Sequence, residues 1–275
     1  MNFLELFQYD FFSNALLGSI FASIVCGIIG TYIVVKRLVF ISGGITHASL
    51  GGLGIGFYAG INPFVSALIF SVFSAFGIQW FSSRQGVRED SAIGAFWSFG
   101  MAIGIICIYL KAGFAPNLSD YLFGNILTIT RTDIYLFIAL SIVLSLVFFF
   151  FRKEILYTSF DPDFARTRHL PIKLIEYSMM FFIAVSIVLI IRLVGVVLLM
   201  SLLTIPQMTA HLYTANYSKI IFLSILFGLI GCISGLILSA YINVPSGAFI
   251  IFTLIAIYFI CRIQCKIMKV EPTKA

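Results

Sequence analysis

Charged side chains are scarce in this sequence. Only 10% of its 275 residues are Asp, Glu, Lys or Arg, whereas 61% are hydrophobic. An ordinary soluble domain carries roughly a quarter charged residues, so a water-facing surface cannot be built from this composition. The chain is therefore expected to lie in a lipid bilayer, where a spanning helix needs about 20 mostly apolar residues.

The sequence patterns of several enzyme classes are also absent. There is no GxxxxGK[ST] stretch to hold nucleotide phosphates, and no HExxH, Ser/His/Asp or paired-carboxylate arrangement lies in the apolar segments. Carboxylates are almost missing from these segments, which disfavours coupling to protons or sodium. We therefore expect no enzyme activity and no cofactor. Transport, if driven, would draw its energy from a partner.

Cysteine usage and the amino terminus add two further exclusions. The five cysteines have no CxxC spacing and lie mostly in apolar segments, so neither a disulfide framework nor a structural zinc site is indicated. The opening MNFLELFQYD lacks the basic residues of a signal peptide, so the first apolar run is expected to remain as an anchor. The chain has a net charge of +6. Because basic residues of membrane proteins usually lie in cytoplasmic loops, this charge does not indicate a nucleic-acid partner, and none is expected.

Nine apolar segments are long enough to cross a membrane. Because they show no alternation, they predict helices, and the fold class is an all-α integral membrane protein. We expect a polytopic bundle of about eight to nine transmembrane helices in a single domain, 1–275. The segments are 13–35, 38–59, 62–82, 91–110, 133–151, 174–191, 193–212, 220–240 and 246–264. The stretch 111–131 contains an apolar part that is too short to cross, and it predicts a re-entrant or surface helix.

The placement of basic residues predicts the orientation. With the N-terminus outside and the C-terminus in the cytoplasm, 14 of the 17 Lys and Arg residues fall on the inner side, where such residues are retained. Lys111, Arg131 and Arg192 are the exceptions. Arg192 divides a long apolar run and is expected at an external turn or as a side chain reaching the interface.

The stretch ISGGITHASLGGLGIG, 41–56, is unusually rich in small and polar residues. Gly43, Gly44, Gly51 and Gly52 permit close backbone approach, so this segment is expected in the interior, lining a path. His47 is ionisable and a common ligand of transition metals, which makes it a candidate metal-binding residue of that path. The alternative is a hydrogen-bonded packing residue.

Further candidate residues lie beside His47 in the sequence and farther along the chain. Thr46 and Ser49 could support the His47 imidazole through their hydroxyl groups. One histidine is not a metal site, so further ligands would come from a second copy of the chain or from water. His169 and His211 are expected to be polar surface residues. Pro206 is expected to kink the seventh helix, either as a gate or as a fixed shape.

Five stretches resemble the metal-importing ABC transporter permeases of the zinc, manganese and iron type, the ABC-3 family. RLVFISGGITHASLGGLGIG is similar to the family's basic pair followed by a GDALSHA-like stretch. IRLVGVVLLMSLLTIPQMTAHL and INVPSGAFIIF resemble its VGxLLxxALLxxPAxxA and DxPSGAxIVL segments. YLFGNILTITRTDI and SFDPDFARTRHLP resemble its LFGSLL stretch and its SFDPEFA loop.

The resemblance implies a set of partners. It implies two permease copies forming a homodimer, two copies of a cytoplasmic ABC ATPase and an extracytoplasmic metal-binding protein, in a bacterial cytoplasmic (inner) membrane. The cytoplasmic loop of about 152–172 would hold the helix that couples to the ATPase. The residues that would dock there are Ser159, Phe160, Asp161, Pro162, Asp163, Phe164 and Ala165.

The sequence departs from the family pattern at one site position. The family has Asp four residues before the histidine, and Gly43 stands there in this chain. Loss of a carboxylate weakens binding of hard Mn²⁺ more than that of Zn²⁺, so zinc is favoured over manganese or iron as the transported ion. The alternatives are a permease for a metal chelate or haem, and a membrane scaffold without transport activity.

Overall fold

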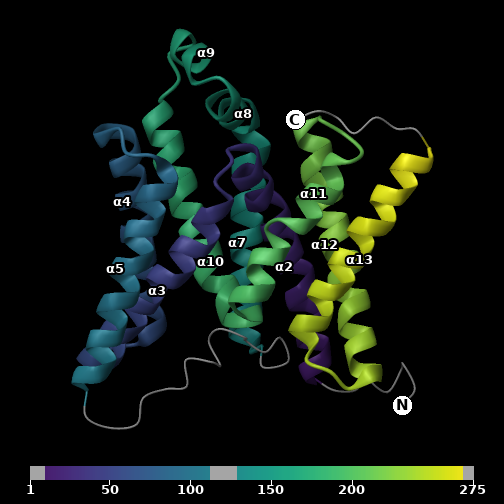
Figure 1. The fold of residues 1–275 in the computed structure, drawn as a ribbon, viewed down its shortest axis with the longest axis horizontal. Coiled ribbons are helices and arrows are strands. Elements are labelled where there is room, and N and C mark those ends of the chain that lie inside the picture. Colours follow the sequence, from purple (N-terminus) through teal and green to yellow (C-terminus); the bar gives the residue numbers. More distant parts are fainter. Residues whose placement is uncertain (1–9, 112–128, 269–275) are drawn as a thin grey trace. The chain divides into compact units, whose positions relative to one another are not determined.

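The computed structural model describes residues 10–111 and 129–268, and within these ranges the regular structure is entirely helical (Figure 1). The elements are α2 (Asp10–Val35), α3 (Val39–Ala59), α4 (Pro63–Gln85), α5 (Glu89–Leu110), α7 (Arg131–Phe150), α8 (Arg152–Phe160), α9 (Pro162–Thr167), α10 (Ile172–Leu202), α11 (Ile205–His211), α12 (Tyr217–Ile242) and α13 (Ser246–Ile267).

Among the described residues, nine helical segments are long and apolar enough to cross a membrane. Their bounds agree with the nine predicted segments to within a few residues, so the predicted fold class is confirmed. Most of the stretch 111–131, with its expected re-entrant or surface helix, lies outside the described residues. The predicted sidedness of the termini stays a prediction.

The contacts divide the described chain into two compact units. Unit 1 contains the described residues of Met1–Val34, Ser119–Phe150 and Leu189–Ala275, and unit 2 those of Val35–Leu118 and Phe151–Val188. Helix α10 begins in unit 2 and ends in unit 1.

Unit 2 is built around glycine contacts between α3 and its neighbours. A Cβ atom added at Gly54 would lie 2.5 Å from the Gly104 carbonyl oxygen of α5, and one at Gly52 would lie 2.5 Å from the Ser66 carbonyl oxygen of α4. Side chains cannot occupy such gaps, so only glycine permits these helices to approach this closely. Helices α3, α4 and α5 therefore form a tightly packed block.

In unit 1 the chain between Leu189 and His211 is broken twice. Gly195 interrupts α10 with φ 75° and ψ 174°, a conformation that favours glycine. The second break separates α10 from α11 just before Pro206, which lies in the first turn of α11. Pro206 therefore lies at the start of a new helix, where its missing N–H costs little. The sequence predicted a bend within one continuous helix, and the structure has two helices instead.

Gln207 stabilises this second break. Its Nε2 donates to the Leu202 carbonyl oxygen at 3.3 Å, the acceptor that an N–H at position 206 would have used in a continuous helix. The same Nε2 donates to the Cys26 carbonyl oxygen of α2 at 2.8 Å. A Cβ at Gly30 would lie 2.3 Å from this nitrogen, so glycine at that position makes room for the amide.

Candidate functional site

His47 lies near the middle of α3, on a helix that is buried at most of its positions. Its ring stacks on the indole of Trp97 from α5, with ring centroids 4.3 Å apart and planes inclined by 7°. Trp97 is held in turn by Met101, whose sulfur accepts from the indole Nε1 at 3.1 Å. The imidazole is therefore oriented by α5.

The two ring nitrogens of His47 differ in their surroundings. Nδ1 is buried and has no hydrogen-bond partner among the described residues. A buried nitrogen is out of reach of an incoming ion, so coordination by this imidazole would fall to Nε2. The residue as a whole is half-buried.

The hydroxyl groups expected to support His47 have other partners. Thr46 Oγ1 donates to the Ser42 carbonyl oxygen at 2.6 Å, and Ser49 Oγ donates to the Thr46 carbonyl oxygen at 2.5 Å. Such bonds to the preceding turn are usual for hydroxyls within helices. The support for the imidazole comes from Trp97, and the Thr46 hydroxyl does not bond Nδ1.

The glycines of α3 are used for packing. A Cβ at Gly44 would lie 2.4 Å from Ile93, and one at Gly51 would lie 2.7 Å from the Gly100 carbonyl oxygen; both of these neighbours are on α5. Gly52 faces α4 in the same way, and Gly43 is buried. The predicted close packing is confirmed for Gly44, Gly51 and Gly52, whereas a path along these glycines stays a prediction.

Within the described residues, no three His, Cys, Asp or Glu side chains gather where they could hold a metal ion. His47 is therefore not part of such a group in this part of the chain. That further ligands come from a second copy of the chain or from water stays a prediction.

The loop expected to couple to an ATPase forms two short helices, α8 and α9, joined at Asp161. Asp161 Oδ1 accepts from the Phe164 backbone N–H at 2.9 Å and Pro162 occupies the first turn, so α9 has a well-formed amino-terminal cap. The Tyr157 and Phe164 rings meet edge to face at 5.2 Å and connect the two helices. The loop is therefore a defined helical element.

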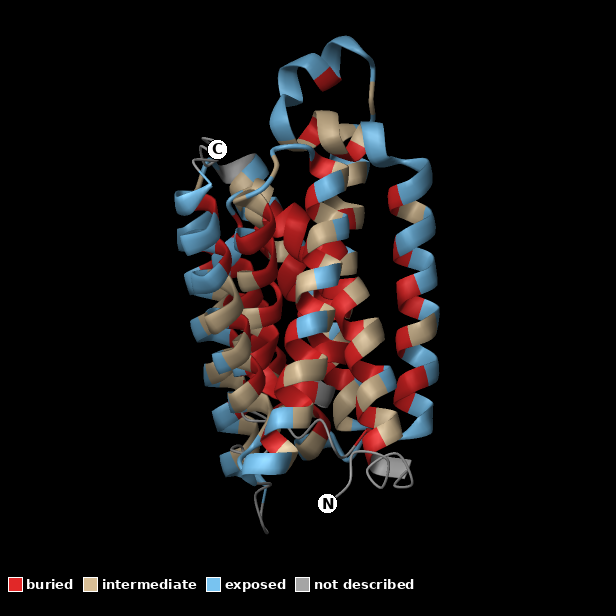
Figure 2. Ribbon diagram, turned by 90° about the vertical axis from the view of Figure 1, so that its right-hand side faces the viewer, coloured by how far each residue is buried: buried red, intermediate tan, exposed pale blue. Residues whose placement is uncertain are grey.

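Most of this element is exposed (Figure 2). Phe160 and Phe164 are 62% and 41% exposed, although both are apolar, and Ala165 is buried beneath them. Asp163 and Arg166 pair at 2.9 Å on the exposed side. Ser159 uses its hydroxyl internally, donating to the Ile155 carbonyl oxygen at 2.6 Å. The surface offered outward thus combines two aromatic rings with charges of both signs.

The remaining predicted residues lie apart from His47 in the sequence and on other elements. His169 follows α9, is exposed and has φ 54°. His211 is the last residue of α11 and belongs to unit 1. The side chain of Arg192 lies outside the described residues, but the position is close to the break at Gly195, near the expected turn.

Trp97 was not among the residues singled out from the sequence. It is one of only two tryptophans in the chain, and it lies in the segment whose Gly100 and Gly104 meet α3. The sequence signal that could have identified it is its position, one turn before a glycine that contacts another helix. Its partner could not be named, because sequence does not give the register between two helices.

The fold and these features define an all-helical, multi-pass membrane protein with an exposed helical loop between α7 and α10. The model of the ABC 3 transport family matches residues 8–265, and the chain belongs to that family.

Relatives in this family are named for metals. The chain is 35% identical to the manganese transport system membrane protein MntC of Listeria monocytogenes, over 94% of this chain and 93% of that protein. It is 30% identical to a probable iron transport system membrane protein of Haemophilus influenzae, over 96% and 97%.

A solved structure has the same fold. PsaBC from Streptococcus pneumoniae in complex with Fab superposes with a TM-score of 0.81 at 31% identity, covering 93% of this chain and 92% of that chain. The arrangement of helices described above is thus shared with a solved member of similar sequence.

Proposed function

We propose that this chain is the permease subunit of an ATP-driven importer that carries divalent transition metal ions across the bacterial cytoplasmic membrane. The observation that carries the proposal is the family match over residues 8–265, together with relatives named for manganese and iron transport. The chain itself would not be an enzyme. It would take its energy from a separate ATPase.

The local geometry supports a metal ion as cargo. His47 lies near the middle of a spanning helix, where an ionisable side chain is costly unless it has a function. A single imidazole, completed by waters or by His47 of a second copy, would bind an ion weakly enough to release it. The ion is transported and is not a resident cofactor.

Two observations favour different metals as the transported ion. The names of the relatives favour manganese or iron. Gly43 replaces a carboxylate of the family pattern, and a site with fewer oxygen donors favours zinc. We propose that all three ions enter the path and that their relative rates depend on the ligands that complete the His47 site.

The exposed loop supports an ATP-driven mechanism. Helices α8 and α9 form a capped, two-helix element with exposed Phe160 and Phe164. An apolar surface held in a rigid element is suited to docking in a groove of a partner protein. We propose that the partner is the cytoplasmic ATPase, present in two copies with two permeases, and that an extracytoplasmic binding protein delivers the ion.

The test is the metal content of cells. A host lacking its own importers would express this chain with its cognate ATPase and binding protein, and manganese, iron and zinc would be measured by elemental mass spectrometry. At least one metal is expected to rise with the wild type and not with a normally inserted His47→Ala variant. His169→Asn is the matched control, because Asn tolerates φ 54° at that exposed position.

If no metal rises although the three proteins assemble, metal-ion import is wrong. If the metal rises equally with His47→Ala, the function stands and His47 does not bind the ion.

A further inference from the structure

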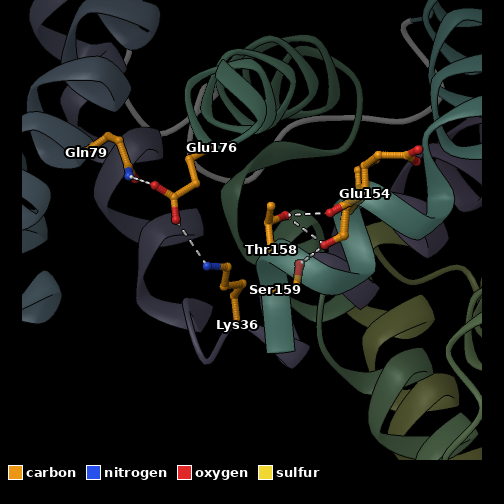
Figure 3. Close-up of polar contacts among 7 residues, drawn as sticks. Lys36, Gln79, Glu154, Thr158, Ser159 and Glu176 are labelled. Atoms are coloured by element: carbon orange, nitrogen blue, oxygen red, sulfur yellow. Dashed lines mark hydrogen bonds and ion pairs between the residues drawn. The ribbon is translucent and has the colours of Figure 1, made fainter. Parts of the chain in front are cut away.

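A cluster of polar side chains connects three elements of unit 2 around Glu176 (Figure 3). One carboxylate oxygen of Glu176 lies 3.4 Å from Lys36 Nζ, and the other accepts from Gln79 Nε2 at 3.0 Å. Lys36 and Glu176 are only 18% and 20% exposed. Both carboxylate oxygens are thus engaged by donors from different parts of the chain.

Adjacent contacts extend this connection. Tyr177 follows Glu176 on α10 and meets the ring of Phe76 on α4 edge to face, with centroids 5.6 Å apart. Phe76 and Gln79 are one turn apart, so two successive residues of α10 contact one face of α4. Glu89, at the start of α5, also interacts electrostatically with this cluster, attracting Lys36 and repelling Glu176.

The cluster is placed between the exposed loop and the helix that carries His47. Glu176 is in the second turn of α10, the helix that begins directly after the α8–α9 element. Lys36 lies in the short link that precedes α3. Because α3 is locked to α4 and α5 by glycine contacts, a force applied at Lys36 or Gln79 acts on the whole block that positions His47.

We propose that Lys36, Gln79 and Glu176 form a polar clamp that transmits movement of the α8–α9 loop to α3, and so couples ATP hydrolysis to the position of His47. Glu176 is a positioning residue and does not touch the ion. The proposal rests on the proposed function, because it names the residues by which the ATPase would act on the metal path. A movement of α10 would pull the α3–α4–α5 block through these bonds.

The first test is the ratio of ATP hydrolysed to metal transported, with the complete transporter in proteoliposomes and Mn²⁺, Fe²⁺ or Zn²⁺ as the probe. Glu176→Gln removes the charge and retains the shape, and Gln79→Leu removes the other bond. Each is expected to lower transport by about 2- to 30-fold while ATP hydrolysis is retained, since residues along a coupling network contribute on that scale. The double variant Lys36→Glu with Glu176→Lys exchanges the two charges and leaves the net charge near Glu89 unchanged. It is expected to restore the ratio of ATP hydrolysed to metal transported.

The controls remove equivalent groups elsewhere. Lys266→Met and Gln264→Leu act on exposed residues of α13 for which no ion pair is found among the described residues. Both are expected to behave as the wild type. The clamp is contradicted if Glu176→Gln leaves the ratio unchanged, or if transport and hydrolysis fall together and the exchanged pair restores neither.

A second measurement does not depend on metal transport. Amide hydrogen exchange of residues 38–59 would be compared with and without a non-hydrolysable ATP analogue in the complex with the ATPase. The wild type is expected to show a nucleotide-dependent difference in α3, and Glu176→Gln is expected to lose it. If the wild type shows this difference but moves none of the three ions, the proposed function fails and the clamp stands. If both proteins show the same difference, the clamp is wrong.

Discussion

At the scale of single residues, the stacking of His47 on Trp97 decides how one imidazole can act within a spanning helix. Stacking fixes the ring plane, and Nδ1 is buried without a hydrogen-bond partner among the described residues. In this chain Gly43 supplies no carboxylate to hold the ring or the ion. Trp97 is the residue that orients the ring, and under the proposed function the charge of the metal site would come from other ligands.

Loss of Trp97 should weaken ion capture. An aromatic pair contributes about 0.5–1.5 kcal/mol beyond its buried area, so Trp97→Ala is expected to raise the KM of metal uptake by about 2- to 10-fold. Trp97→Phe retains a ring and should retain most of the affinity. The measurement is the initial uptake rate at increasing metal concentration, which separates KM from the maximal rate.

The other tryptophan supplies the control for this experiment. Trp80 on α4 is 41% exposed and contacts Phe81, so Trp80→Ala removes the same side chain away from His47. It is expected to leave the KM unchanged. An unaltered KM in Trp97→Ala would mean that the stack does not position the ligand nitrogen.

At the scale of helices, the backbone contact between α3 and α5 sets the shape of unit 2. A Cβ at Gly100 would lie 2.5 Å from the Cα atom and 2.7 Å from the carbonyl oxygen of Ala48. Both are backbone atoms, so no rotation of a side chain can relieve the overlap. Gly100→Ala must separate the two helices next to His47 and Trp97.

This separation should lower stability. Overpacking typically costs about 1–3 kcal/mol, so Gly100→Ala is expected to lower the midpoint of thermal unfolding in detergent. Gly94→Ala on the same helix is the matched control, since a Cβ there meets no atom within 4 Å. The control should keep or raise the midpoint, because Ala favours helix over Gly by up to about 1 kcal/mol. Equal midpoints for the two variants would contradict the close contact.

Features that depend on local sequence could be predicted, whereas features that depend on contacts between distant residues could not. The spanning helices could be, because long apolar runs in lipid leave the backbone little choice. Arg192 indicated a turn in the long apolar run, but the break just before Pro206 could not be told from a bend, because a proline is compatible with both a kinked helix and the first turn of a new one. Glu176 was missed because a lone charge near a helix start resembles an interfacial residue until Lys36 and Gln79 are brought to it by tertiary packing.

At the scale of the whole molecule, the α8–α9 loop stands out because two exposed aromatic rings, those of Phe160 and Phe164, lie among its charged residues. The Asp161 cap and the contact between Tyr157 and Phe164 stabilise the element without a partner. Phe160, at 62% exposed, presents much of its ring outward, where an interface could cover it. A preformed element loses little conformational entropy on binding, which favours affinity.

Phe160→Ala should therefore weaken assembly with the ATPase. Truncating a central interface residue commonly costs more than 1 kcal/mol, so the Kd for the purified ATPase is expected to rise by about tenfold or more. The measurement is binding of the ATPase to the permease in nanodiscs, with thermal unfolding of each permease as a check on its fold. Phe259→Ala removes a similarly exposed ring from α13 and should leave the Kd unchanged. Wild-type affinity in Phe160→Ala would exclude this ring from the docking surface, whereas loss of binding in both variants would point to lipid contacts or general destabilisation.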